Sequence, residues 1–259
     1  MDIDHDQTKY EVLSTSNAST KTALLFRADG SASWKVGNAH LIASVSGPLE
    51  VLKKDEQPTV ATIELVVRPH IGVTSTTEQY IQDRIRKVIS PLIILELHPR
   101  TLIQIVIQII QSGDLRKMNT LALSAGINAT YMALLDGGIP LRSTVSACSL
   151  IHVQQQDGSN LILVDPNLKE LQSHQDNIRS VHTFAYEIKT GKIERLLLSE
   201  STGKFTSEEL FDFYDRAADI CVRTNLVMRR SIIATAEKQN RWKETGHKIK
   251  SVNNKVRKQ

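Results

Sequence analysis

The sequence has little cysteine, and it has no apolar run long enough to cross a bilayer. Its two cysteines, Cys148 and Cys221, lie inside apolar stretches without the CxxC spacing of a zinc or redox motif. We expect them to be reduced thiols in the core of an intracellular protein. The longest apolar runs, such as ISPLIILEL at residues 89–97, reach about half the length of a membrane-spanning helix. No membrane partner is therefore predicted.

A secretory signal is absent too. The first residues, MDIDHDQTKYE, are acidic and polar, with neither the basic region nor the apolar core of a signal peptide. This composition predicts a cytosolic or nuclear location. The glycosylation sequons at Asn17 and Asn128 are then chance matches, because their chemistry belongs to the secretory route.

The common catalytic motifs are missing as well. There is no GxGxxG after a strand, no phosphate-binding GxxxxGK, no GxSxG and no HExxH. The histidines are scattered, and only His174 and His182 come near each other and near carboxylates. Such a pair is more often two solvated loop residues than a metal site. No metal and no cofactor are therefore predicted.

The net charge of +4 is concentrated at the carboxyl end. Residues 238–259 contain eight Lys or Arg against one acid, Glu244. This composition is typical of a solvated helix end, or of a basic tail that binds phosphate backbones or directs nuclear import. A tail of this kind gives affinity for RNA without sequence choice.

Strand signals dominate the first part of the chain. A hairpin is predicted around Asp29-Gly30, between two runs of β-forming residues. Residues 38–51 and 59–69 alternate or run apolar, and Gly47-Pro48 and Pro69 punctuate them. A three- or four-stranded antiparallel sheet is the economical interpretation.

The middle of the chain changes to helical periodicity. An amphipathic helix is predicted from Thr76, bent at Pro91, because apolar residues recur at helical spacing and charges lie mostly opposite. Residues 101–113 are a β-branched run that predicts a buried strand. Residues 121–138 are rich in Ala and end in Gly137-Gly138, which predicts a tightly packed helix with a glycine cap.

The last part predicts hairpins around Asp157-Gly158 and Thr190-Gly191. A final helix starts at the capping box Thr206 to Glu209, and its apolar stripe stops near Ala236. Strands and helices are mixed along the chain without strict alternation. The sequence therefore predicts an α+β fold with mixed β-sheets packed with helices.

Four segments of the chain carry a family resemblance. They are RADGSASWKVGNAHLIASVSGP, HPRTLIQIVIQIIQSGD, LSAGINATYMALLDGGIPL and KFTSEELFDFYDRA. Together they resemble the RNase PH family, and within it the ring subunits of the eukaryotic RNA exosome. The resemblance covers roughly residues 22–236 and implies the RNase PH-like fold, which is the fold of domain 2 of ribosomal protein S5. We accordingly expect an N-terminal arm at 1–20, the RNase PH-like domain at 21–236 and a basic tail at 237–259.

Active members of the family are implied to shorten RNA from its 3′ end with phosphate as the nucleophile. Such chemistry needs a cationic cradle for phosphate and acids that hold a divalent ion. The family pattern supplies an Arg at the start of the first long helix and a Gly-Thr-Arg word before the Ala-rich helix. It also supplies two Asp around the strand that follows.

This sequence departs from that pattern at each position. Thr77 stands at the helix start, and 121–123 (Leu-Ala-Leu) replaces Gly-Thr-Arg, so the cationic cradle is missing. Asp165 matches a strand-ending residue that is not one of the catalytic pair. The acidic word expected after it is replaced around residues 169–171 (Lys-Glu-Leu), and Ser180 stands where the second acid is expected. Asp176 could take that register if a gap moved, so its role stays open. No catalytic residue is predicted.

The resemblance implies a non-catalytic ring subunit that scaffolds a barrel and lines its RNA channel, in support of 3′-to-5′ RNA processing and degradation. It implies other RNase PH-like ring subunits in a hetero-hexamer, S1- and KH-domain cap subunits and single-stranded RNA as partners, in the nucleus and nucleolus and also in the cytoplasm. The candidate RNA contacts are basic residues in the tail and in or just after the loop that joins the first sheet to the helix, namely Arg68, Arg84, Arg86, Lys238, Arg241 and Lys243.

Two alternatives stay open at this point. One is a metal-dependent 3′-to-5′ exoribonuclease, phosphorolytic or hydrolytic, with a relocated site near Asp165, Glu170 and Asp176. The other is a free RNA-binding module that uses the basic tail and is homodimeric.

Overall fold

The computed structural model describes residues 10–13, 18–112, 120–155 and 159–256, with side chains between residues 18 and 237. The helices are α1 (Thr76–Ile89), α2 (Thr120–Asp136), α3 (Leu168–Ser173) and α4 (Ser207–Val256), with short 3-10 turns η1 (Leu95–Leu97) and η2 (Gln175–Asn177). The strands are β1 (Tyr10–Leu13), β2 (Ser19–Thr22), β3 (Gly30–Val36), β4 (Ala39–Glu50), β5 (Thr62–Arg68), β6 (Thr101–Gln111), β7 (Thr144–Gln154), β8 (Asn160–Val164), β9 (Ile178–Lys189) and β10 (Lys192–Gly203).

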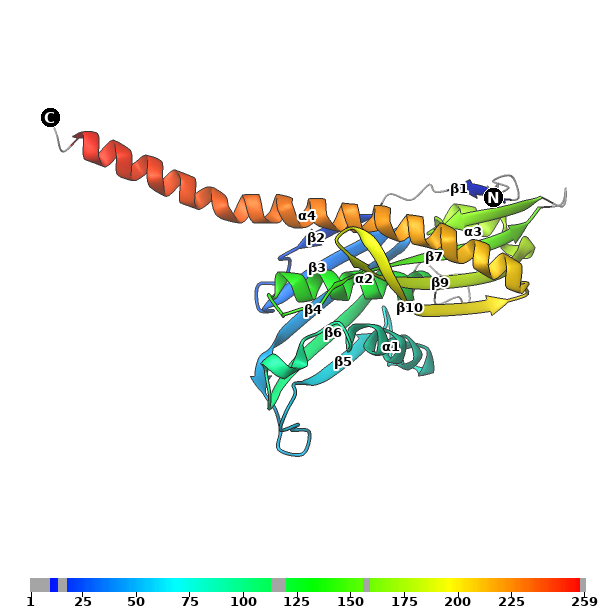
Figure 1. Cartoon of the computed structure of the whole chain (residues 1–259), viewed down its shortest axis with the longest axis horizontal. Helices are drawn as coiled ribbons and strands as arrows, with labels where there is room; N and C mark the ends of the chain where they lie inside the picture. The colour runs from blue at the N-terminus through cyan, green and yellow to red at the C-terminus, as the bar shows by residue number, and fades with distance from the viewer. Residues whose placement is uncertain (1–9, 14–17, 113–119, 156–158, 257–259) are drawn as a thin grey trace, which may run out of the picture.

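Two five-stranded sheets enclose α2 (Figure 1). One sheet has the order β2-β3-β4-β6-β5, and the other has the order β1-β8-β7-β9-β10. Each contains one parallel pair, β5 with β6 and β1 with β8, and its other pairs are antiparallel. The helix α2 contacts β3 and β4 on one side and β7 and β9 on the other. The predicted α+β fold with mixed sheets is confirmed.

The helix α2 has no exposed face along most of its length, since every residue from Thr120 to Leu134 is buried. Small residues allow this packing. A Cβ on Gly126 would lie 2.7 Å from Cδ1 of Ile85 in α1. Asn128, one of the buried polar residues of α2, fixes the helix to β7, because its side chain donates to the carbonyl of Ala147 and accepts from the same residue's amide, both at 2.8 Å.

The helix α1 starts with a capping box between Ser75 and Glu78, and its buried residues Ile81, Ile85, Val88 and Ile89 form one face. It ends at Ile89, one residue before the cap Ser90. The predicted bend at Pro91 is therefore wrong. Pro91 has no amide hydrogen with which to extend the helix, and so the helix stops before it.

Two strand predictions also need correction. The predicted hairpin is present, because β2 and β3 pair antiparallel, but its loop comprises residues 23–29 and Gly30 is already the first residue of β3. The Asp29 carboxylate instead accepts the amide of Gly47 at 2.8 Å, and a Cβ on Gly30 would lie 2.3 Å from the carbonyl oxygen of Ala133. The first sheet is five-stranded and mixed, not a smaller antiparallel sheet, because α1 carries the chain across from β5 to β6 in parallel.

The remaining turns and the last helix follow the sequence more closely. The hairpin at Thr190-Gly191 is confirmed, with both residues at positive φ. The strands β7 and β8 pair as predicted, but the turn at Asp157-Gly158 lies outside the described residues. The predicted strand over residues 101–113 and the Ala-rich helix are confirmed as β6 and α2.

The helix α4 begins with the predicted capping box, in which the Thr206 amide donates to Glu209 at 2.7 Å and the Glu209 amide donates to the Thr206 hydroxyl at 3.3 Å. Its stripe of Phe213, Ala217 and Cys221 is buried beside β7 and β9. Cys148 and Cys221 are buried free thiols, as expected. Figure 1 shows the C-terminal part of α4 extending beyond the body. The division into arm, domain and tail stays a prediction.

Among the described residues, no helix is both long and apolar enough to cross a membrane.

The Asn128 pairing makes a first prediction. Asn128→Ala leaves the amide and the carbonyl of Ala147 unpaired inside the protein, so the free energy of unfolding should fall by roughly 2 to 4 kcal/mol in urea denaturation. Gln172→Ala, on an exposed position of α3, is the matched control and should change it by less than about 0.5 kcal/mol. Equal effects from the two variants would contradict the role given to Asn128.

Candidate functional site

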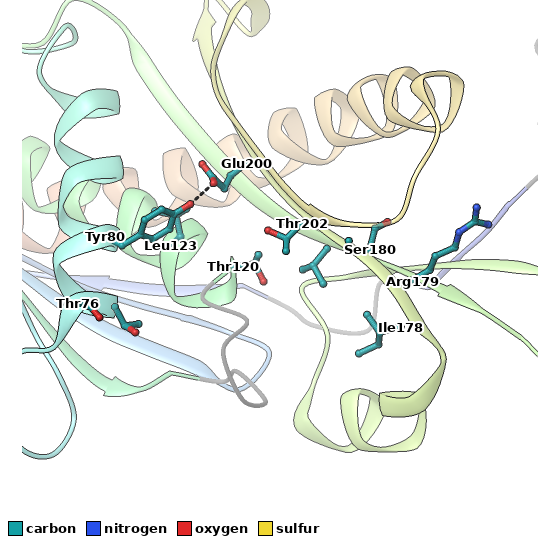
Figure 2. A pocket seen from close by; sticks show the side chains of 12 residues that line it. Thr76, Tyr80, Thr120, Leu123, Ile178, Arg179, Ser180, Glu200 and Thr202 are labelled. Atoms are coloured by element: carbon teal, nitrogen blue, oxygen red, sulfur yellow. Dashed lines mark hydrogen bonds between the residues drawn. The ribbon is translucent and has the colours of Figure 1, made fainter.

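A cavity of about 520 Å³ opens between the starts of α1, α2 and β9 and the end of β10. The described residues that line it are Thr76, Thr77, Tyr80, Thr120, Leu123, Ile178, Arg179, Ser180, Val181, Glu200, Thr202 and Gly203. Figure 2 shows these side chains coming from separate parts of the chain around one space. The cavity thus lies where α1, α2, β9 and β10 come together.

Three positions singled out by the family resemblance meet in this cavity. Thr77 comes from the start of α1, Leu123 from the first turn of α2, and Ser180 from β9. Leu121 and Ala122, which share the replaced Gly-Thr-Arg word with Leu123, are buried. The structure thus brings together the positions expected to hold phosphate and metal in active relatives, and here they carry hydroxyl or apolar groups.

The charged side chains that line the cavity form ion pairs. Among its described lining residues, Arg179 and Glu200 are the charged ones. Arg179 pairs with Glu209 at 3.6 Å, and Figure 2 shows its guanidinium pointing away from the other lining residues. Glu200 accepts the Tyr80 hydroxyl and pairs with Nε of Arg84 at 3.1 Å.

Tyr80, Arg84 and Glu200 tie α1 to β10 along one wall of the cavity. The guanidinium of Arg84 lies 4.9 Å from the centre of the Tyr80 ring. Burial, with the hydrogen bond to Glu200, raises the pKa of Tyr80, so its hydroxyl stays a donor. Sequence reasoning missed this group, because Tyr80 counted only as a residue of the apolar face and Glu200 lies in a strand without any motif.

The hydroxyl-bearing residues give the cavity a neutral polar surface. Thr76, Thr77 and Thr202 join Thr120 and Ser180 in its lining. Thr120 Oγ1 is buried without a hydrogen-bond partner among the described atoms. Ser180 Oγ instead lies 2.8 Å from Nε2 of a buried histidine. Such groups can hydrogen-bond a ligand, but they do not balance the charge of a phosphate dianion.

That histidine is His182, one of the pair considered for metal binding. Its Nε2 and Nδ1 lie 2.8 Å from the hydroxyls of Ser180 and Ser201, and its ring packs against Phe205. Burial lowers the pKa of His182 to about 4. His174 lies apart from this environment, at the end of α3. With both ring nitrogens of His182 engaged by hydroxyls, the pair does not form a metal site.

The three acids of the alternative hypothesis are held in different ways. Asp165 is buried at the end of β8, where it accepts the Ser149 amide at 3.0 Å, and burial raises its pKa to about 7. Glu170 accepts the Asn167 amide at 2.9 Å and caps α3. Asp176 is exposed in η2. Across the described part of the chain, no three His, Cys, Asp or Glu gather as metal ligands.

The candidate RNA contacts have different surroundings. Arg68, at the end of β5, and Arg86, on α1, are exposed. Arg84 is engaged by Glu200, so it belongs to the wall of the cavity. The backbone of Lys238, Arg241 and Lys243 belongs to α4, and their side chains lie outside the described ones.

Comparisons with known proteins agree with this architecture. The sequence profile of the 3′ exoribonuclease family, domain 1, matches residues 17–140. Exosome complex component RRP46 of Saccharomyces cerevisiae is 35% identical over 212 residues, which are 81% of this chain and 92% of that protein. Exosome complex component rrp46 of Schizosaccharomyces pombe is 35% identical over 199 residues, 76% of this chain and 81% of that protein.

A solved structure supports the same relationship. The crystal structure of rice (Oryza sativa) Rrp46 superposes with a TM-score of 0.68 at 25% identity, and the match covers 82% of this chain and 93% of the rice chain. Within its family, the sequence by itself most resembles the subunit called ribosomal RNA-processing protein 46, and these relatives confirm that resemblance. The chain therefore belongs to the RNase PH family, in the branch of the RRP46 proteins.

Proposed function

We propose that this chain is a non-catalytic structural subunit of the RNA exosome core ring. The observation that carries the proposal is the 35% identity to yeast RRP46 over 92% of that protein, which is named an exosome complex component. In this role the chain supports 3′-to-5′ RNA processing and degradation by building the barrel and lining its channel. Its partners are other RNase PH-like ring subunits and the S1- and KH-domain cap subunits. It works in the nucleus and nucleolus, and also in the cytoplasm.

The lining of the cavity supports the non-catalytic part of the proposal. A phosphate nucleophile needs charged donors, because neutral hydroxyls compensate little of its charge. Thr77 and Leu123 line the cavity at the two positions where the family resemblance expects arginines. The nearby arginines, Arg84 and Arg179, are already paired with Glu200 and Glu209. The lining of the cavity therefore favours a structural role over phosphate chemistry.

The metal-dependent alternative has less support. Its Asp165 carries a pKa of about 7 because it is buried, and a carboxyl that holds its proton near neutral pH is a poor ligand for a divalent ion. Glu170 is occupied as a helix cap. Asp176 alone is exposed, and one carboxylate binds a divalent ion weakly.

The catalytic prediction is tested with purified full-length chain, single-stranded RNA, phosphate and magnesium. We expect no nucleoside diphosphates above the protein-free blank, whereas an active RNase PH in parallel should release them. Asp176→Ala should behave as the wild type. Diphosphate release that Asp176→Ala abolishes would overturn the non-catalytic assignment and restore the alternative.

The channel role gives a second prediction. Within the assembled complex, Arg68→Gln combined with Arg86→Gln should weaken RNA binding evenly across sequences. The slope of log affinity against log salt should shrink by about 0.7 for each lost phosphate contact. Salt titration of fluorescent RNA measures it. Lys192→Gln, an exposed charge on β10, is the control. An unchanged slope in the double variant would show that these two arginines do not contact RNA in the channel.

The buried state of Asp165 gives a third prediction. Its pKa is about 7 in the folded chain against 3.8 as the ordinary value, so its stabilising contribution is present below 3.8 and is lost as the pH rises through 7. Asp165→Asn can keep the Ser149 hydrogen bond and does not titrate. As the pH is raised from about 5 to about 8, the free energy of unfolding of the wild type should therefore fall by roughly 2 kcal/mol more than that of the variant.

Urea unfolding at both pH values measures this difference, and other titrating groups cancel because both chains share them. A constant difference between variant and wild type would show that Asp165 is ionised throughout, which would favour the metal-binding alternative.

A further inference from the structure

The segment that joins β2 to β3 exposes three consecutive apolar side chains. Leu24 and Leu25 are each 43% exposed, and Phe26 is fully exposed at 102%. Scattered apolar residues are ordinary on a protein surface, but a contiguous group marks a site of interaction. Arg27 follows directly and is exposed as well.

Hydrogen bonds hold the backbone of this segment in place. One carboxylate oxygen of Asp136, the last residue of α2, accepts the amides of Ala23 at 3.1 Å and Ser31 at 2.9 Å. The Ser31 hydroxyl accepts the amides of Leu24 and Leu25, both at 2.9 Å. Ala23 is held at φ +57°, a strained conformation for a residue with a side chain. The backbone is thus fixed in a form that presents the apolar side chains to solvent.

A groove of about 710 Å³ begins beside this segment, between β2 and α4. Two hydrogen bonds join β2 to α4 at this groove. Ser231 Oγ donates to the Thr20 carbonyl at 3.3 Å, and the hydroxyls of Thr22 and Thr235 lie 2.9 Å apart. Figure 1 shows β2 lying beneath α4. The described residues that line this β2–α4 groove are Thr20, Lys21, Thr22, Ala23, Leu24, Arg230, Ser231, Ala234 and Thr235.

The charge of the groove has one sign. Lys21 and Arg230 are exposed, and no acid belongs to its described lining. Within the described residues, neither of the two forms an ion pair. Asp136 does not line the groove, and one of its carboxylate oxygens accepts the two amides of the segment. The groove therefore offers two cations next to an apolar surface.

These observations favour one kind of ligand. Leu24, Leu25 and the methyl of Ala234 fit apolar side chains. RNA bases bind best where several aromatic rings are available for stacking, and among the residues of this groove and segment Phe26 is the aromatic one. We propose that the β2–α4 groove and the Leu24–Phe26 segment form a docking site for an extended segment of a partner protein that carries apolar side chains flanked by Asp or Glu. This docking site is separate from the cavity and does not depend on the proposed ring function.

The test uses the full-length chain and a fluorescein-labelled short peptide of alternating leucine and glutamate as the probe. Fluorescence anisotropy should show it binding at least about tenfold more tightly than a peptide of alternating leucine and lysine. Lys21→Glu combined with Arg230→Glu should weaken binding of the acidic peptide about tenfold, and so should Leu24→Asp. Lys192→Glu, the same charge reversal on β10, should leave it unchanged. Circular dichroism checks that each variant is folded.

Four outcomes would overturn the proposal. Equal binding of the two peptides would show that the charge of the groove does not select the ligand. An equal loss of peptide binding in Lys192→Glu would show that the peptide does not bind in this groove. Displacement of the peptide by polyuridine RNA, with RNA binding lost in the groove variants, would make the groove an RNA site. Dimerisation of the wild type that the groove variants abolish, without peptide binding, would make the occupant a second copy. None of these results bears on ring membership, which the composition of the native complex decides separately.

Discussion

The helix α2 is buried on every side between two five-stranded sheets, and the positions of the other functional elements follow from that packing. A helix without a solvent face needs small residues where it meets its neighbours, and Gly126 against Ile85 and Gly30 against Ala133 meet that need. The buried amide of Asn128 then fixes its register on β7. Because α2 begins at the cavity and ends at Asp136, one helix positions both the cavity and the exposed segment after β2.

The position of the cavity does not depend on the side chains that line it. Its location is set by α1, α2, β9 and β10, which the core holds in place regardless of what the lining residues do. The charged groups nearby, Arg84 with Glu200 and Arg179 with Glu209, satisfy one another. These two pairs join neighbouring elements, α1 to β10 and β9 to α4.

Sequence reasoning succeeded where a pattern had one physical meaning. The Ala-rich run closed by Gly137-Gly138 could bury all its faces, and the capping box at Thr206 could start only a helix. It failed where a residue served a distant partner. Asp29-Gly30 has the composition of a tight turn, but Asp29 binds Gly47 and Gly30 makes room for Ala133. Tyr80 and Glu200 are 120 positions apart, so no local pattern could join them.

We infer that this chain works as one member of a ring of distinct RNase PH-like subunits. Native mass spectrometry of the endogenous protein, purified under mild conditions, measures the composition of that ring. We expect a complex that contains one copy of this chain with other RNase PH-like subunits and S1- or KH-domain proteins. Recovery of the chain as a monomer or a homodimer, without RNase PH-like partners, would contradict it.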